Sequence, residues 1–136
     1  MATIRKEMTL RANAAHVWDA IRDVGAIHTR LAPGFITDVQ LDGDTRTVTF
    51  ANGNVAKELI VTMDDAACRL VWSVVGTQMT HHNASIQVFA EGGRSHLVWI
   101  ADILPDALAG YIGGMMQQGM DAMKRKLEAD SAVAAE

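Results

Sequence analysis

Residues 105–128 read PDALAGYIGGMMQQGMDAMKRKLE, and this stretch decides how the rest of the chain is organised. At about 100° per residue of an α-helix, its apolar side chains fall on one half of the cylinder. Pro105 suits the first position of a helix, and the cations of residues 124–126 suit its last turns. The pattern therefore predicts a long amphipathic helix, whose apolar face is formed by Leu108, Tyr111, Ile112, Met115, Met116, Gly119, Met120, Met123 and Leu127.

Two properties of this face are unusual for a tightly packed core. Met115, Met116, Met120 and Met123 are flexible side chains that adapt to irregular spaces. Gly119 adds no side-chain volume at the centre of the face. We therefore predict that the helix covers a cavity.

The composition bounds the class of protein. A chain of 136 residues fits one domain, and 49% hydrophobic with 21% charged residues is typical of a globular protein. The formal net charge of −4 and the scattered basic residues argue against nucleic acid as a partner.

Cysteine usage and the start of the chain bear on its location. Cys68 is the one cysteine, which excludes an internal disulfide and suits a reducing cytosol. Residues 1–10 alternate like a strand instead of forming a signal peptide, and no apolar run approaches the ~18 residues of a membrane span. We expect a cytoplasmic protein without membrane insertion.

The middle of the chain reads as a series of short strands joined by turns. Residues 3–10 alternate, and residues 14–24 and 26–31 form two short helices, the first capped by Asn13. Turn signals such as Asp42-Gly43-Asp44 then separate six further strands at 35–41, 45–51, 55–63, 69–75, 80–89 and 95–104. Hairpins followed by one helix predict an α+β fold with an antiparallel sheet of about seven strands.

Several strings in this order carry a family resemblance. They are HVWDAIRDVGAIHTRLAPG (16–34), AKELIVTMDD (56–65), RLVWSVVG (69–76), HLVWIADILPD (96–106) and the terminal helix. The chain resembles the START-like superfamily, also called polyketide cyclase/dehydrase-like or SRPBCC proteins, which have a helix-grip fold. The resemblance implies a curved sheet wrapped around the C-terminal helix, with a hydrophobic cavity between them. We expect a single ligand-binding domain at 1–128 and a frayed tail at 129–136.

Glu58 lies at a position where the resemblance implies a carboxylate that faces the cavity. A carboxylate within an apolar strand needs a partner, such as water, a cation or a donor on the ligand. The alternative is a solvent-facing glutamate, because Val55, Leu59, Val61 and Met63 form a more apolar face opposite it. If Glu58 faces inward, those four residues need cover, which a homodimer would provide.

The two tryptophans of the later strands are candidate walls of the cavity. Trp72 shares one face with Leu70 and Val74, and the resemblance places its matching aromatic in the cavity. Both faces of the strand around Trp99 are apolar, so periodicity does not choose its direction.

His81 and His82 suggest polar chemistry. His82 shares a face with Ala84, Ile86 and Val88, so we predict that it points inward and His81 outward. An inward imidazole beside Glu58 would form a polar pair that binds a hydroxyl or carbonyl, or transfers a proton. The alternative is a histidine with a structural role. No metal-ligand spacing is present, and we expect no metal and no cofactor.

The predicted function is binding of a hydrophobic small molecule, such as a lipid, polyketide or aromatic metabolite. One alternative is a polyketide cyclase or aromatase using Glu58 and His82, and a second is a protein-interaction module without ligand. No nucleophile elbow, phosphate loop or dinucleotide motif is present. The candidate ligand-binding residues are Val48, Phe50, Glu58, Ile60, Trp72, Val74, His82, Trp99, Ile112, Met115, Met116, Gly119 and Met123.

Overall fold

A computed structural model describes the backbone of residues 1–135 and the side chains of residues 1–132. Its elements follow the predicted order of one strand, two short helices, six strands and a long helix. They are β1 (Ala2–Leu10), α1 (Ala14–Arg22), α2 (Ile27–Arg30), β2 (Ile36–Asp42), β3 (Thr45–Phe50), β4 (Val55–Asp64), β5 (Arg69–Val75), β6 (His81–Glu91), β7 (Arg94–Leu104), a 3-10 turn (Asp106–Leu108) and α3 (Ala109–Ala135).

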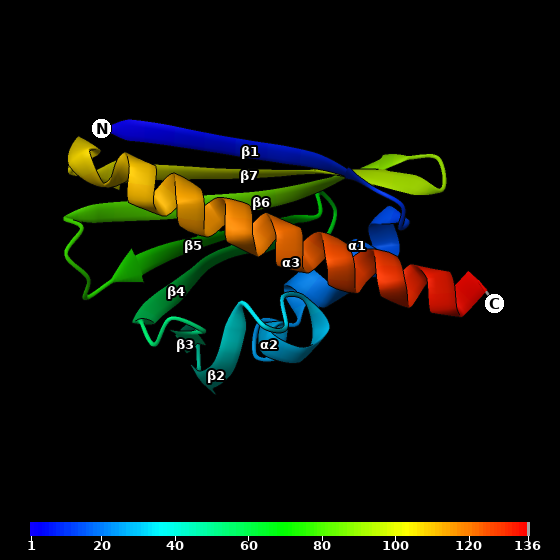
Figure 1. Ribbon diagram of the computed structural model, residues 1–136, viewed down its shortest axis with the longest axis horizontal. Coiled ribbons are helices and arrows are strands. Elements are labelled where there is room, and N and C mark those ends of the chain that lie inside the picture. Colours follow the sequence, from blue (N-terminus) through cyan, green and yellow to red (C-terminus); the bar gives the residue numbers. More distant parts are fainter. Residues whose placement is uncertain (136) are drawn as a thin grey trace.

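The seven strands form one antiparallel sheet in the order β1-β7-β6-β5-β4-β3-β2. Every neighbouring pair is a hairpin except β1 and β7, which brings the first strand beside the last. α3 runs along the whole sheet and packs against β1, as Figure 1 shows. The predicted α+β fold, with a sheet wrapped around a long C-terminal helix, is confirmed.

The two short helices cover one end of the concave face of the sheet. The Asn13 side chain accepts a hydrogen bond of 2.8 Å from the His16 backbone N–H, as an N-cap does. Val17 and Ile21 of α1 are fully buried, together with Leu97 of β7 and Leu127 near the end of α3. The densest part of the core therefore lies beneath α1 and the second half of α3.

The long helix differs from its predicted bounds at both ends. Pro105 lies in extended backbone before the 3-10 turn, so it is not the first residue of the helix. At the other end, α3 passes the predicted limit at Glu128 and continues to Ala135. Residue 136, the last of the predicted frayed tail, lies outside the described residues.

A register shift in β4 changes which residues share a face. Ile60 lies opposite Trp72, whereas Thr62 lies opposite Val71, so one residue of β4 is left over between them. Directly opposed residues of two strands point to the same face. Met63 is opposed to the buried Leu70 and so lies on the concave face. Simple alternation had placed it on the outer face, which was wrong.

Candidate ligand-binding cavity

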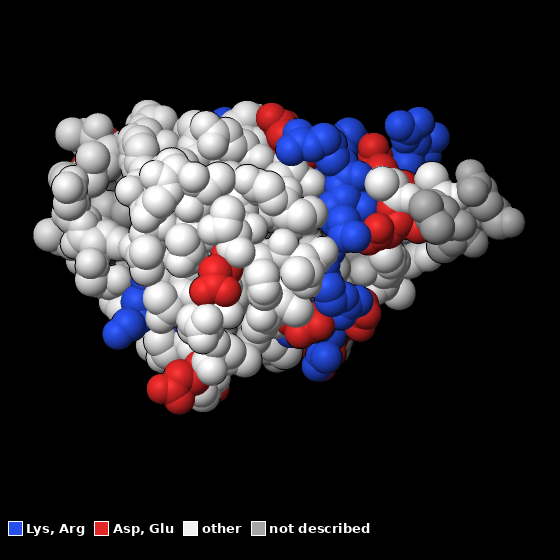
Figure 2. Space-filling view, turned by 60° about the horizontal axis from the view of Figure 1, so that its bottom comes forward, with Lys and Arg blue, Asp and Glu red and all other residues white. Residues whose placement is uncertain are grey.

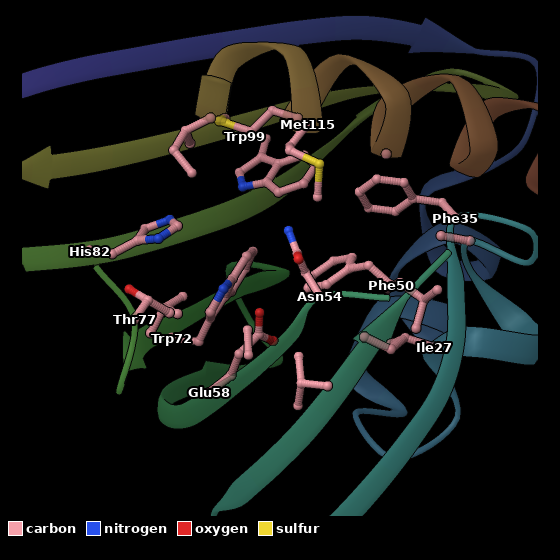
Figure 3. A pocket seen from close by; sticks show the side chains of 18 of the residues that line it. Ile27, Phe35, Phe50, Asn54, Glu58, Trp72, Thr77, His82, Trp99 and Met115 are labelled. Atoms are coloured by element: carbon pink, nitrogen blue, oxygen red, sulfur yellow. The ribbon is translucent and has the colours of Figure 1, made fainter. Parts of the chain in front are cut away.

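A cavity of about 670 Å³ lies between the concave face of the sheet and the first half of α3. Its floor comes from β3 to β7, one end from α2 and the following loop, and its cover from α3 and the β3–β4 and β5–β6 loops. This volume is within the range of small-molecule sites, which is about 300–1,000 Å³. Figure 3 shows the side chains converging on this space from several strands and from α3.

Most of the residues predicted to bind ligand line this cavity. They are Phe50, Glu58, Trp72, Val74, His82, Trp99, Ile112, Met115, Met116, Gly119 and Met123. For Trp99, the register settles what periodicity left open, because its neighbour across the strands is the buried Ile86, which also lines the cavity. Whether these residues bind a ligand stays a prediction.

Two predicted residues, Val48 and Ile60, are not among the lining residues. Val48 is fully buried between Val39 and Ala56 of the adjacent strands, at the part of the sheet that α2 approaches. Ile60 is half-buried and packs against the core just before the register shift. Alternation identified their face correctly, but helix packing decides which part of that face stays open.

Sequence reasoning missed further lining residues in the strands, in α2 and the segment after it, in the loops and near the start of α3. Two loops contribute most of the polar ones. The missed residues are Ile27, Leu31, Ala32, Phe35, Ile36, Arg46, Asn54, Val55, Ala56, Gly76, Thr77, Gln78, Met79, Ile86, Leu108 and, as a cavity residue, Tyr111.

Arg46 is the most consequential omission, because it is the partner of Glu58. The Arg46 Nε donates to Glu58 Oε1 at 2.7 Å, and both residues are buried, at 3% and 7% exposure. The Arg46 guanidinium also lies 5.6 Å from the centre of the Trp72 ring, and its Nη1 donates to the Val24 carbonyl at 3.4 Å. Glu58 therefore faces inward, and its charge is already compensated within the protein.

A sequence signal for this pair was present in the hairpin. Gly53 has a φ of +88° and ends the turn between β3 and β4, which suits glycine. Counting outward from that turn places Arg46 opposite Glu58, as the register shows. Opposite charges at matching distances from a glycine turn indicate a cross-strand pair.

The predicted pairing of Glu58 with His82 is wrong. β5 separates β4 from β6 in the sheet, so side chains on β4 and β6 are about 9–10 Å apart at their base. Figure 3 shows Trp72 between the two side chains. Glu58 instead bonds to Arg46 on the neighbouring strand β3.

Two polar atoms in the cavity wall have no partner. They are the Nδ1 of His82 and the indole Nε1 of Trp99, both buried without a hydrogen bond. Burial lowers the pKa of His82 below its ordinary value, and the nearby His81 lowers it further. The His82 imidazole is therefore neutral at pH 7, with one nitrogen as donor and the other as acceptor.

The space expected above Gly119 is already filled. A Cβ at Gly119 would lie 3.0 Å from the Trp99 ring and 3.1 Å from the Phe35 ring. Phe35 also packs edge-on against Phe50 at 5.3 Å between ring centres, and Trp72 and Trp99 lie 6.1 Å apart. Gly119 thus allows two aromatic rings to approach the helix, and the glycine and both rings border the cavity.

Three segments that contribute lining residues carry no charged side chains. Segments 50–56, 74–82 and 107–120 contain no Asp, Glu, Lys or Arg. Two contacts join the β3–β4 loop to α3 there: the Asn54 amide donates to the Tyr111 hydroxyl at 2.7 Å, and the Asn52 amide lies 3.8 Å from the Met115 sulfur. In Figure 2, Lys and Arg gather in a band across one part of the surface, whereas the larger part is almost uncharged.

Metal-binding groups and membrane-spanning helices are both absent from the part of the chain that the structure describes. Within residues 1–132, no three side chains of His, Cys, Asp or Glu come together in a group able to hold a metal ion. In the same residues, no helix is both long and apolar enough to span a lipid bilayer.

A curved antiparallel sheet, a long helix across it and a cavity between them define the START-like, helix-grip class of proteins. Within that class, residues 1–128 match the family described as "Polyketide cyclase / dehydrase and lipid transport", and the chain belongs to this family. A search of curated proteins finds no match.

Solved structures show the same fold. The protein XoxI from Bacillus cereus is 19% identical with a TM-score of 0.84, over 93% of this chain and 96% of that one. The di-domain ARO/CYC protein BexL from the BE-7585A biosynthetic pathway is 15% identical with a TM-score of 0.80, over 94% of this chain and 47% of that one. A START superfamily protein from Mycobacterium smegmatis is 8% identical with a TM-score of 0.73, over 97% and 98%.

Proposed function

We propose that the protein binds a hydrophobic small molecule, such as a lipid, polyketide or aromatic metabolite, in the cavity beneath α3. The observation that supports this most strongly is the concentration of aromatic residues. The chain has three Trp, one Tyr and three Phe residues, and five of these seven line the cavity. Four methionines add an adaptable apolar surface: Met79, Met115, Met116 and Met123.

The family description agrees with this proposal in general terms, because it joins polyketide chemistry with lipid transport. Apolar walls would supply most of the affinity, and the few polar groups would fix the orientation of the ligand. We assign the walls mainly to Phe50, Trp72, Trp99 and Met115, and the orienting role to His82 and Trp99.

A thermal-shift screen tests this function. The protein is heated with fatty acids, flavonoids and polyketide-like aromatic compounds, and ligands of the native state raise its Tm. Ala56→Phe would place a ring in the cavity and should reduce the shift. Leu59→Phe is the matched control, because Leu59 lies on the exposed outer face of the same strand. A screen in which no compound class raises the Tm contradicts the proposal.

A cyclase is the second candidate, and one observation favours it. A half-buried, neutral His82 can accept a proton from a bound substrate. Glu58 is less suited to share that work, since it already bonds to Arg46. In an enzyme, His82→Ala together with Glu58→Gln should abolish turnover of a polyketide substrate. In a carrier, the same change should alter only the affinity.

We also propose a cytoplasmic location, because the free Cys68 is compatible with a reducing compartment.

The homodimer stays a prediction. Leu59 and Val61 of β4 are exposed on the outer face, whereas Val55 borders the cavity, and association of two copies would remove Leu59 and Val61 from water. Light scattering coupled to size exclusion measures the mass in solution, and a strict monomer at high concentration removes this prediction.

A further inference from the structure

We infer that the cavity selects uncharged aromatic molecules carrying a hydrogen-bond acceptor, such as an aryl ketone, and discriminates against aromatic carboxylates. This rests on the proposed function, and it names the class of ligand that the same site takes. Three features support it: the internal ion pair, the unpartnered polar atoms and the aromatic walls.

The ion pair leaves no cation for an anionic ligand. Among the described residues that line the cavity, Arg46 is the one Lys or Arg and Glu58 the one Asp or Glu. They bond to each other at 2.7 Å, and the Arg46 guanidinium makes further contacts with the Val24 carbonyl and the Trp72 ring. A carboxylate that enters would lose its hydration and would add a second anion beside Glu58.

The two unpartnered nitrogen atoms favour a ligand that carries a hydrogen-bond acceptor. The indole Nε1–H of Trp99 can only donate, and it is buried without a partner. The Nδ1 of His82 is also buried without a partner, and it donates or accepts according to the tautomer. In Figure 3 both rings border the same part of the cavity, with the Trp99 nitrogen on the side toward His82 in this view. A neutral carbonyl or phenol oxygen placed there satisfies Trp99 and can bond to His82 without bringing a charge.

The walls favour a flat ligand. Phe35 and Phe50 meet edge-on, and Trp72 and Trp99 are inclined to each other by 50°. Aromatic rings stack or meet edge-to-face with such surfaces in preference to filling them irregularly. An extended fatty acyl chain gains apolar contact there but none of this geometry.

The test uses two probes of nearly the same shape, 2-acetylnaphthalene and 2-naphthoate, which differ in a methyl group against a carboxylate oxygen. Calorimetric titration at pH 7.5 should give a Kd at least about tenfold lower for the ketone, since an uncompensated buried charge is costly. Equal affinity, or tighter binding of the carboxylate, overturns the inference while the proposed function stands. If neither probe binds although other compounds raise the Tm, the aromatic class is wrong. If no compound of any class binds, the proposed function fails as well.

Any apolar pocket prefers a ketone to some degree, so a variant must isolate the ion pair. Glu58→Gln keeps the shape of the side chain and releases Arg46 as a free cation. It should shift the ratio of the two Kd values toward naphthoate by about tenfold or more, as charge-assisted hydrogen bonds do. The matched control is Arg46→Gln with Glu58→Gln, which removes both charges and should keep the preference for the ketone. An unchanged ratio in a folded Glu58→Gln protein contradicts the inference.

A second variant keeps the test decisive if Glu58→Gln does not fold. Trp99→Phe retains an aromatic ring, removes the indole donor and makes the side chain smaller. It should weaken binding of 2-acetylnaphthalene by about 3- to 10-fold, which corresponds to one hydrogen bond. It should change the binding of naphthalene, which has no acceptor, by less. Equal losses for both compounds would show that Trp99 acts only as an apolar surface and would overturn its assigned role.

Discussion

The two halves of α3 have the same amphipathic pattern and opposite surroundings. In the second half, Leu127 is fully buried against α1 and the sheet, and Glu128 accepts a hydrogen bond of 2.8 Å from the Arg11 backbone. In the first half, Ile112, Met115 and Met116 line the cavity. One helix thus anchors the fold at one end and encloses empty space at the other.

The largest expected loss of stability is an exception to this division, because it comes from a residue that lines the cavity. Arg46→Met leaves Glu58 as a buried, unpaired carboxylate, and removing one partner of such a pair typically costs about 3–5 kcal/mol. Urea denaturation measures the loss. The double variant Arg46→Met with Glu58→Met should recover most of it, since both charges are then gone. A double variant as unstable as the single one would mean that the pair is not what stabilises this region.

Truncation of apolar residues on α3 tests the division directly. Leu127→Ala should lower the free energy of unfolding by about 3 kcal/mol, because it opens a hole in a packed core. Ile112→Ala should cost about 1–2 kcal/mol, because its side chain already borders open space. Ligand affinity should change in the opposite order, falling for Ile112→Ala and little for Leu127→Ala. Equal losses of stability would show that the first half of α3 is packed as tightly as the second.

Within the first half of α3, the glycines differ in what they face: Gly110 and Gly114 are exposed to solvent, whereas Gly119 is buried against two aromatic rings. Gly110→Ala and Gly114→Ala should each stabilise the protein by about 0.5–1 kcal/mol, because alanine favours a helix and nothing obstructs its methyl group. Gly119→Ala should instead destabilise it by about 1 kcal/mol, since the methyl group would press on Trp99 and Phe35. Thermal denaturation of the three variants measures the difference. Stabilisation by all three would mean that the rings move aside freely.

The smallest expected effect concerns His82 and pH. Its pKa is lowered in the folded protein by burial, so between that pKa and the ordinary value of 6.5 the unfolded chain binds more protons. The contribution of His82 to the free energy of unfolding is therefore full above pH 6.5 and decreases as the pH falls toward the folded pKa. In His82→Phe this part of the pH dependence should be absent. Parallel stability curves for wild type and variant between pH 5 and 8 would contradict the assignment.

The sequence predicted the order of elements because its signals are local. Alternation in β1 and the glycine turns after β2 and β3 depend only on neighbouring residues, and all of them appear in the structure. The inward direction of Glu58 was predicted from the family resemblance, because the local pattern also allowed a glutamate that faces solvent.

The predictions that were wrong depended on contacts between distant segments. Val48 and Phe50 share a face of β3, yet Val48 is buried in the core and only Phe50 borders the cavity. The extra residue after Ile60 moved Met63 to the other face. The hairpin turn between β3 and β4 already places Arg46 opposite Glu58, but excluding His82 as the partner required the order of the strands.

Binding of a neutral aromatic ligand beneath the first half of α3 would change the surroundings of particular tryptophans, and the three indole N–H signals report on it. Trp72 and Trp99 line the cavity, whereas the Trp18 indole donates to Asp65 at 2.9 Å outside it. In ¹H–¹⁵N spectra recorded during titration with 2-acetylnaphthalene, assigned with single Trp→Phe variants, the Trp99 signal should move furthest, the Trp72 signal should follow, and the Trp18 signal should stay in place. Saturating ligand that leaves Trp72 and Trp99 unmoved, or that moves Trp18 most, would contradict the account.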